Sequence, residues 1–273
     1  MTPAGAAAAG RAPTERHPPA GAAAAGRAPT ERHPAGDGRT AGPTLVVIEH
    51  EPDAPPALLG DAARAAGVEL RVVRAGEGEP VPANLGDAAG LVVLGGAMGV
   101  ADVAAWPHLD ETMALIRAAA ARSAPVLGIC LGAQLAAHAL GGRAYTGAGG
   151  LEIGWVRVEL TAAGRADPVL GALAEPAEVF HWHRDTFDLP PDAVLLARSD
   201  LYANNAFRLG SVVGVQFHPE VDAGTIAGWY ALDKEGGASA AYPEVDAVSG
   251  TAVRADRARQ VLDAFCQSVR PGR

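Results

Sequence analysis

The sequence predicts an α/β protein built on a doubly wound, mostly parallel sheet flanked by helices. Two observations lead to this fold class. Short apolar runs rich in β-branched residues alternate with helical segments between residues 44 and 140, which is the pattern of parallel strands joined by helices. The runs are almost continuously apolar, as expected for strands that are buried on both faces.

Glycine and proline mark the ends of the elements in this first region. Gly67 suits the position just after a helix, where the left-handed conformation is common, and Pro107 suits the first turn of a helix. Gly141 and Gly142 close the last helix of the region. We expect strands at 44–48, 68–73, 90–94 and 125–129, and helices at 56–66, 107–121 and 131–140.

Beyond residue 150 the sequence becomes richer in strands. The apolar runs are separated by turn-forming residues and only one long helical segment follows them. We expect strands at 153–160, 177–181, 193–198 and 211–217, and a C-terminal helix at 256–269. The stretch 232–250 is loop-like and is expected to form a lid or a partner contact.

The first 42 residues differ in composition from the rest of the chain. Residues 3–18 recur letter for letter as residues 19–34, and Ala, Pro, Gly and Arg dominate both copies. Such a segment buries too little apolar surface to offset the entropy lost on ordering. We therefore expect residues 1–42 to be a disordered low-complexity tail, with a basic docking arm as the alternative, and residues 43–273 to form the folded domain.

Charge and hydropathy exclude several classes of protein. The net charge is −9 although the first 42 residues carry more basic than acidic side chains, so the folded domain is acidic. An acidic surface argues against nucleic acid as a partner. Because no uncharged apolar run reaches about 18 residues, we expect no membrane span. The N-terminus lacks a secretory pattern, and we expect a cytoplasmic protein.

Two cysteines, Cys130 and Cys266, are too few for a disulfide scaffold. No Cys and His residues show the paired spacing of a zinc site, so no metal is expected. Cys266 lies among apolar residues of the C-terminal helix and should belong to the core. His50, His108 and His138 are expected to be structural or exposed.

The motif around Cys130 carries the first chemical signal. Gly128-Ile-Cys-Leu-Gly-Ala-Gln134 joins a buried strand to a helix through a sharp turn, which is the arrangement of a nucleophile elbow. Gly128 and Gly132 permit the close backbone approach that the turn requires. The helix N-terminus favours the thiolate, which is the attacking species. The backbone N–H of Leu131 should point to the place where an oxyanion would form.

A second motif, Val215-Gln-Phe-His-Pro-Glu220, supplies a proton shuttle. His218 and Glu220 are two residues apart at the end of a strand, so both side chains can lie on one side of the chain. His218 would act as general base and then as general acid. Glu220 would orient the imidazole and stabilise its charged form.

Together these motifs resemble those of the class I glutamine amidotransferases, and more narrowly the stand-alone proteins related to the amidotransferase domain of GMP synthase. The resemblance covers about residues 44–225. Other stretches agree with it: Val93–Met98, Glu152–Trp155, Trp182–Phe187 and Ala206–Arg208.

The resemblance implies a flavodoxin-like class I amidotransferase architecture with the site at the carboxyl ends of the strands. It implies that Cys130, His218 and Glu220 form the catalytic triad. The implied reaction is attack on the γ-amide of glutamine, release of ammonia and hydrolysis of a γ-glutamyl thioester. This chemistry requires no cofactor and no metal.

Further roles follow from matching motif positions. Gly96 is expected to supply the second oxyanion N–H beside Leu131. Gln134 is expected to contact the amino-acid part of glutamine, and the segment from His183 to Asp185 to flank its carboxylate and amine.

Two positions depart from the family pattern and leave the substrate open. Arg184 stands where glycine is frequent, and Asn205 where glutamine is frequent. An alternative substrate is therefore a γ-glutamyl amine, which would make the enzyme a γ-glutamyl hydrolase or peptidase. A catalytically silent binding or regulatory module is the third alternative. No synthetase domain follows in the sequence, so either a separate synthetase partner binds the acceptor of ammonia or there is no acceptor.

Overall fold

The computed structural model describes residues 42–173, 175–233 and 237–270. The tail expected over residues 1–42, with its repeat, lies outside the described residues except for Gly42. Among the described residues, no helix combines the length and the apolar character needed to cross a membrane.

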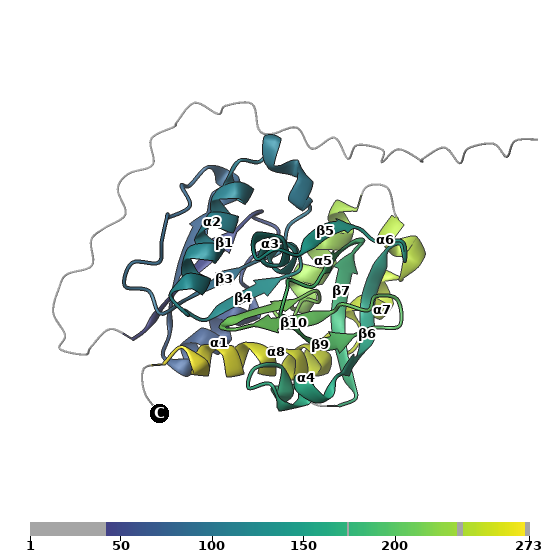
Figure 1. Cartoon of the computed structure of the whole chain (residues 1–273). Coiled ribbons are helices and arrows are strands. Elements are labelled where there is room, and N and C mark those ends of the chain that lie inside the picture. Colours follow the sequence, from purple (N-terminus) through teal and green to yellow (C-terminus); the bar gives the residue numbers. More distant parts are fainter. Residues whose placement is uncertain (1–41, 174, 234–236, 271–273) are drawn as a thin grey trace, which may run out of the picture. The chain divides into compact units, whose positions relative to one another are not determined.

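A nine-stranded sheet forms the centre of the molecule, in the order β2-β1-β3-β4-β11-β10-β9-β6-β7 (Figure 1). The five strands from β2 to β11 are parallel, and the remaining neighbours pair antiparallel. A separate two-stranded sheet joins β5 and β8. The strands are β1 (Thr44–Glu49), β2 (Glu69–Arg74), β3 (Gly90–Val93), β4 (Val126–Ile129), β5 (Arg143–Thr146), β6 (Glu152–Leu160), β7 (Ala177–His183), β8 (Asp185–Asp188), β9 (Val194–Arg198), β10 (Ala206–Leu209) and β11 (Val212–Val215).

Helices cover both faces of the sheet, which confirms the predicted fold class. Helices α1, α4 and α8 lie along one face, and α2 and α3 lie along the other (Figure 1). The helices are α1 (Leu58–Ala66), α2 (His108–Ala121), α3 (Leu131–Ala139), α4 (Ala162–Ala166), α5 (Ala223–Leu232), α6 (Gly237–Ala241), α7 (Glu244–Val248) and α8 (Thr251–Ser268), with short 3-10 turns at η1 (Ala75–Glu77), η2 (Val100–Ala104) and η3 (Leu170–Ala172).

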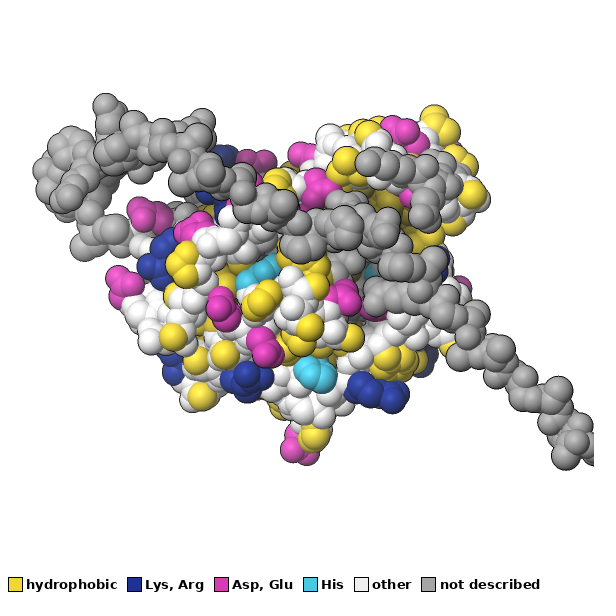
Figure 2. Space-filling view, turned by 90° about the horizontal axis from the view of Figure 1, so that it is seen from above, with side chains coloured by type: hydrophobic (Ala, Val, Ile, Leu, Met, Phe, Trp, Pro, Cys, Tyr) yellow, Lys and Arg dark blue, Asp and Glu magenta, His cyan; other side chains and the backbone are white. Residues whose placement is uncertain are grey.

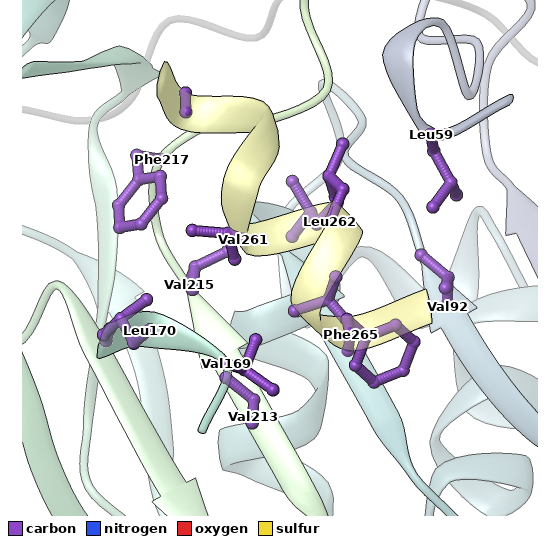
Figure 3. Packing of buried hydrophobic residues seen from close by; sticks show 14 of the residues in the cluster. Leu59, Val92, Val169, Leu170, Val213, Val215, Phe217, Val261, Leu262 and Phe265 are labelled. Carbon is purple, nitrogen blue, oxygen red and sulfur yellow. The ribbon is translucent and has the colours of Figure 1, made fainter. Parts of the chain in front are cut away.

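Alternation along the buried strands divides the core into two layers. In β1, Leu45 and Val47 pack on the α1 and α8 side, whereas Val46 and Ile48 pack on the α2 and α3 side. Figure 3 shows the first layer, where side chains of α8 such as Phe265 meet those of the strands. The continuous apolar runs in the sequence thus correspond to strands that are buried on both faces.

The face shown in Figure 2 carries both kinds of charge without a strong separation. On the face shown in Figure 2, acidic side chains are scattered among hydrophobic ones, and basic side chains do not gather into a single large patch.

The segment 232–250 differs from the loop that the sequence predicts. It contains the short helices α6 and α7, although residues 234–236 are not described. Tertiary contacts hold these helices: the Trp155 Nε1–H donates to the Ala247 carbonyl, and the Tyr230 hydroxyl donates to the Tyr242 carbonyl. Helices of five residues carry no periodicity that a sequence could reveal. Helix α8 also begins at Thr251, five residues before the predicted start.

Parallel strands end at a common edge of the sheet, and this edge positions the candidate site. The strand order reverses direction between β1 and β3, which are neighbours although β2 separates them in the sequence. Such a switch point is where open α/β sheets bind their ligands. Chain segments that follow β1, β3, β4 and β11 therefore meet in one region.

Candidate active site

Cys130 occupies the turn between β4 and α3 in a strained conformation. Its φ is 50° and its ψ is −108°, a region that residues with a side chain rarely adopt. The Cys130 N–H donates to the Val215 carbonyl at 2.8 Å, and the Cys130 carbonyl accepts from the Gln134 N–H at 3.1 Å. These bonds tie Cys130 to β11 on one side and to α3 on the other, so the thiol is held at the N-terminus of a helix.

Two glycines bring α3 close enough to the sheet to form this turn. A Cβ at Gly132 would lie 2.1 Å from the Val93 carbonyl oxygen, and one at Gly128 would lie 2.5 Å from the Gly132 carbonyl oxygen. Neither position has room for a side chain. The motif glycines are therefore required by the contact of the first turn of α3 with β3 and β4.

The structure brings His218 and Glu220 to the same place. The His218 Nδ1–H donates to Glu220 Oε1 at 2.8 Å, and the side chains of both residues are 4% exposed. The backbone N–H of His218 donates to the Phe180 carbonyl, which fixes the end of β11 against β7. The imidazole and the Cys130 side chain lie side by side, because both face the position of Gly95. The three residues predicted as a triad thus form one contiguous set.

Electrostatics favour a charged His218. Burial disfavours the imidazolium, but the negative charges of Glu220 and of the Cys130 thiolate outweigh it and raise the pKa of His218 to about 10. The ring therefore carries a proton at neutral pH. A protonated imidazole beside a thiol can supply the proton that the leaving group of thiol chemistry requires.

Gly95 and Gly96 follow β3 and border Cys130. A Cβ at Gly95 would lie 3.0 Å from His218 Cε1 and 3.6 Å from the Cys130 Cβ, whereas one at Gly96 would lie 3.1 Å from the Leu131 side chain. Leu131 is the first residue of α3, where backbone N–H groups have no acceptor within the helix. The two residues expected to provide oxyanion donors are therefore neighbours.

The loop that contains Gly96 is held from β1. Glu51 lies two residues beyond the end of this strand, and its Oε2 accepts a hydrogen bond from the Ala97 N–H at 2.9 Å. The switch point between β1 and β3 thus fixes the backbone on which one predicted oxyanion donor depends.

Gln134 lies inside a buried chain of amides instead of facing open solvent. Its Nε2 donates to the Asp185 carbonyl at 3.1 Å and to Gln216 Oε1 at 3.2 Å. Gln216 Nε2 in turn donates to the Cys130 Sγ at 3.5 Å. Gln216 was not among the residues predicted for the site, although it belongs to the second motif.

His183 and Asp185 flank the same region and are anchored by buried hydrogen bonds. The His183 ring nitrogens lie 3.0 Å from the Asp185 carbonyl and 2.9 Å from Glu152 Oε2. Burial raises the pKa of Glu152, but hydrogen bonds from His183 and Ser199 and the nearby histidines lower it overall. Glu152 is therefore ionised and holds the His183–Asp185 segment in place.

One buried group in the described part of the chain has the composition of a metal site. The ligand atoms of Glu152, His181 and His183 lie within 4.8 Å of one another. These residues come from β6 and β7, which explains why spacing in the sequence did not reveal them. His181 Nε2 already lies 2.6 Å from Asn205 Oδ1, and His183 is paired as described. Protein hydrogen bonds thus close this cluster without an ion.

The two positions that depart from the family pattern have different environments. Asn205 is fully buried and contacts His181 and the Ser199 hydroxyl, so it cannot line an open pocket. Arg184 is exposed, and its carbonyl accepts hydrogen bonds from the Gly147 N–H and the Tyr202 hydroxyl.

Trp229 is a second neighbour of the site that the motifs did not indicate. Its ring centroid lies 4.9 Å from that of His218, with the planes at 69°. The Trp229 Nε1–H donates to the Asp53 carbonyl at 2.7 Å, which fixes the indole. A tryptophan in an apolar helix is usually a core residue, so nothing in the sequence of α5 indicates this contact.

Comparison with known proteins adds independent evidence. A family profile described as glutamine amidotransferase class-I matches residues 57–229. The chain is similar to the glutamine amidotransferase-like protein YfeJ of Salmonella typhimurium, with 34% identity over 155 residues, which span 55% of this chain and 64% of that protein. It is also similar to a subunit of the glutamine-hydrolyzing GMP synthase of Halobacterium salinarum, with 37% identity over 51% of this chain and 70% of that protein.

Solved structures show the same architecture. A glutamine amidotransferase of Thermotoga maritima superimposes with a TM-score of 0.77 at 28% identity, covering 85% of this chain and 99% of that one. A glutamine amido transferase of Methylobacillus flagellatus gives a TM-score of 0.74 at 31% identity, covering 86% of this chain and 98% of that one.

Proposed function

The chain belongs to the class I glutamine amidotransferase family, and from this premise we propose that it hydrolyses the γ-amide of glutamine through a thioester on Cys130. The observation that carries the proposal is the strained Cys130 at the N-terminus of α3, in contact with a buried, charged His218 that donates to Glu220. A thiolate, a proton donor and an orienting carboxylate are the groups that amide cleavage by a thiol requires.

In the first half-reaction the Cys130 thiolate attacks the amide carbon, and the carbonyl electrons move to the oxygen. The backbone N–H groups of Leu131 and Gly96 would stabilise this oxyanion. As the C–N bond breaks, the imidazolium of His218 gives its proton to the leaving nitrogen, and ammonia departs. A γ-glutamyl thioester remains on the sulfur.

In the second half-reaction His218, now neutral, takes a proton from water. The hydroxide that forms attacks the thioester carbon, and the C–S bond breaks to release glutamate and the thiolate. Glu220 keeps the ring oriented through its contact with Nδ1 in both steps. Water is the only co-reactant that the two half-reactions require. A cytoplasmic location is part of the proposal, because the two cysteines are free and form no disulfide of the kind that small secreted domains carry.

The ammonia is proposed to serve a separate synthetase. The Halobacterium salinarum relative is named as one subunit of a GMP synthase, so a protein of this kind functions beside another chain. Since the chain spans only 64% of YfeJ, we extend no further property of these relatives to it.

The proposal is tested by measuring glutamate and ammonia release from L-glutamine. We expect the Cys130→Ala variant to lose turnover by at least about 10³-fold, because no other group replaces the nucleophile. Cys266→Ala is the matched control: Cys266 is fully buried in the α8 core, and its removal should leave turnover unchanged. Equal turnover in the wild type and Cys130→Ala would refute the proposal.

A γ-glutamyl amine is the second candidate substrate. Arg184 favours it, because this side chain departs from the family pattern and is exposed beside the predicted substrate-binding residues His183 and Asp185. Release of the free amine at a higher kcat/KM than ammonia from glutamine would favour it. The third possibility, a catalytically silent module, is tested with a glutamine-like electrophile that labels a reactive thiol. Labelling of Cys130 without turnover indicates an enzyme that waits for its partner, whereas absence of labelling indicates a silent module.

A further inference from the structure

The end of β11 directs two polar side chains toward the sulfur, and the mechanism above uses only one of them. Gln216 and His218 are two residues apart and therefore share one side of the chain, whereas Phe217 between them packs into the core with α8 (Figure 3). Gln216 is fully buried, and its Nε2 lies 3.5 Å from the Cys130 Sγ. Its backbone N–H donates to the Asn205 carbonyl at 2.8 Å, which fixes its position.

The hydrogen-bond pattern determines which end of the Gln216 amide faces the sulfur. The Asp185 carbonyl is a backbone group and can only accept, so Gln134 must turn its Nε2 toward it. The same Nε2 lies 3.2 Å from Gln216, which must therefore present Oε1. The NH₂ group of Gln216 is then left pointing at Cys130. The His183 ring, which lies 2.9 Å from Glu152 Oε2 and 3.0 Å from the Asp185 carbonyl, anchors the start of this chain.

We propose that Gln216 is a further catalytic residue, whose side-chain amide donates a hydrogen bond to the Cys130 thiolate. This inference rests on the proposed thiol chemistry and adds a second donor to the sulfur beside His218. Hydrogen bonds to a charged acceptor are roughly twice as strong as those between neutral groups. Gln216 therefore stabilises the thiolate before attack, and again when the sulfur leaves the thioester carbon as a thiolate.

The same chain of amides connects the nucleophile to the segment expected to bind the substrate. A substrate that contacts the backbone of 183–185 would act on the Asp185 carbonyl, which Gln134 contacts directly. Any shift of Gln134 changes the donor that orients Gln216. The strength of the hydrogen bond to the sulfur thus depends on the segment that holds the amino-acid part of the substrate.

The test uses the pH dependence of alkylation of Cys130 by iodoacetamide, followed by mass spectrometry of the peptide that contains it. Alkylation reports the thiolate and needs no glutamine turnover, so it remains informative even where the proposed glutaminase activity fails. Gln216→Met keeps the length of the side chain but removes the donor. We expect its alkylation profile to move to higher pH by about one to two units, and kcat/KM to fall about 10–100-fold.

Gln216→Asn is the second variant, because its shorter amide stays neutral and polar but withdraws the donor from the sulfur. It should shift the profile in the same direction. Gln267→Met, an exposed replacement on α8, controls for the chemistry of the substitution and should leave the profile in place. Thermal unfolding establishes that each variant is folded, and Gln216→Asn decides alone where Gln216→Met does not fold. Folded variants that alkylate with the wild-type profile would overturn the proposal.

Discussion

The charge of His218 depends on two partners that lie on different elements. Burial alone would lower the pKa of the ring, whereas Glu220 and Cys130 both raise it. Removing either partner should therefore lower the pKa of the ring, even if the geometry is preserved.

We predict that Glu220→Gln lowers the pKa of His218 below its value of about 10. The sign follows from the charges: a carboxylate favours the imidazolium, a neutral amide does not, and the burial that disfavours it remains. Titration of the His218 ring by NMR measures the shift. The loss of the orienting carboxylate should reduce kcat/KM by about 10²–10⁴-fold. An unchanged titration midpoint in the variant would show that Glu220 does not determine the charge.

Among single residues, the sequence predicted those members of the candidate site that lie within short, recognisable motifs. Cys130, His218 and Glu220 were recognisable because the elbow pattern and the His-Pro-Glu spacing are local. Gln216 lies in the same motif, but its role depends on Gln134 and Asp185, which only the fold brings near. Trp229 was missed for a related reason, since its contact with His218 joins two elements that carry no common pattern.

Among the elements, α3 depends on a close approach to the sheet that a single methyl group would prevent. The Cβ of an alanine at position 132 would lie 2.1 Å from a backbone carbonyl of β3, and backbone cannot move aside as a flexible side chain can. The first turn of α3 carries both Cys130 and the Leu131 N–H, so any displacement of the helix moves the nucleophile and the predicted oxyanion donor together.

Gly132→Ala should therefore reduce stability and activity at once. We expect the free energy of unfolding to fall by about 1–3 kcal/mol, as for other overpacked sites, with a loss of glutamine turnover in the folded protein. Gly60→Ala is the control, because Gly60 lies in α1 and no atom lies within 4 Å of the position of an added Cβ. This variant should gain about 0.5–1 kcal/mol in the free energy of unfolding. Urea unfolding measures the stability of both variants. A Gly132→Ala variant as stable as the wild type would contradict the close contact.

The predictability of the elements varied with their length and their partners. The strands of the parallel half and the long helices had continuous apolar runs or clear ends, such as Gly67 with its left-handed conformation. The short helices α6 and α7 had neither feature. They form because contacts from Trp155 and Tyr230 hold them and the residues beside them. Likewise the pairing of β6 with β7, which assembles the Glu152 cluster, is set by tertiary structure alone.

For the whole molecule, the alternation of strands and helices was enough to predict the class of the fold. The antiparallel half was expected only as a region rich in strands, and its order across the sheet could not be deduced, because strands far apart in sequence are neighbours there. β11, for example, lies between β4 and β10. This insertion delivers His218 and Gln216 to Cys130, so the geometry of the candidate site depends on the least predictable part of the topology.

A property of the molecule as a whole is its response to acid, which two buried histidines should dominate. Burial lowers the pKa of His50 to about 3, with His108 adding to the effect, and burial likewise lowers the pKa of His181 to about 4. Both ring nitrogens of His50 lack a hydrogen-bond partner among the described residues, and its ring stacks on that of His108 at 5.3 Å. In the native state these rings stay neutral where an unfolded chain would bind protons.

The sign of the effect follows from linkage. Between the unfolded value near 6.5 and the lowered native values, the unfolded state binds more protons, so stability is fully present above pH 6.5 and is lost as the pH falls. Each histidine contributes up to about 1.4 kcal/mol per pH unit in this window. The free energy of unfolding of His50→Leu should therefore fall by about 2 kcal/mol less than that of the wild type between pH 6.5 and about pH 5.

Urea unfolding at both pH values measures this difference, with the exposed replacement His138→Gln as the control. Parallel losses in the wild type and His50→Leu would mean that His50 takes up its proton in the folded protein.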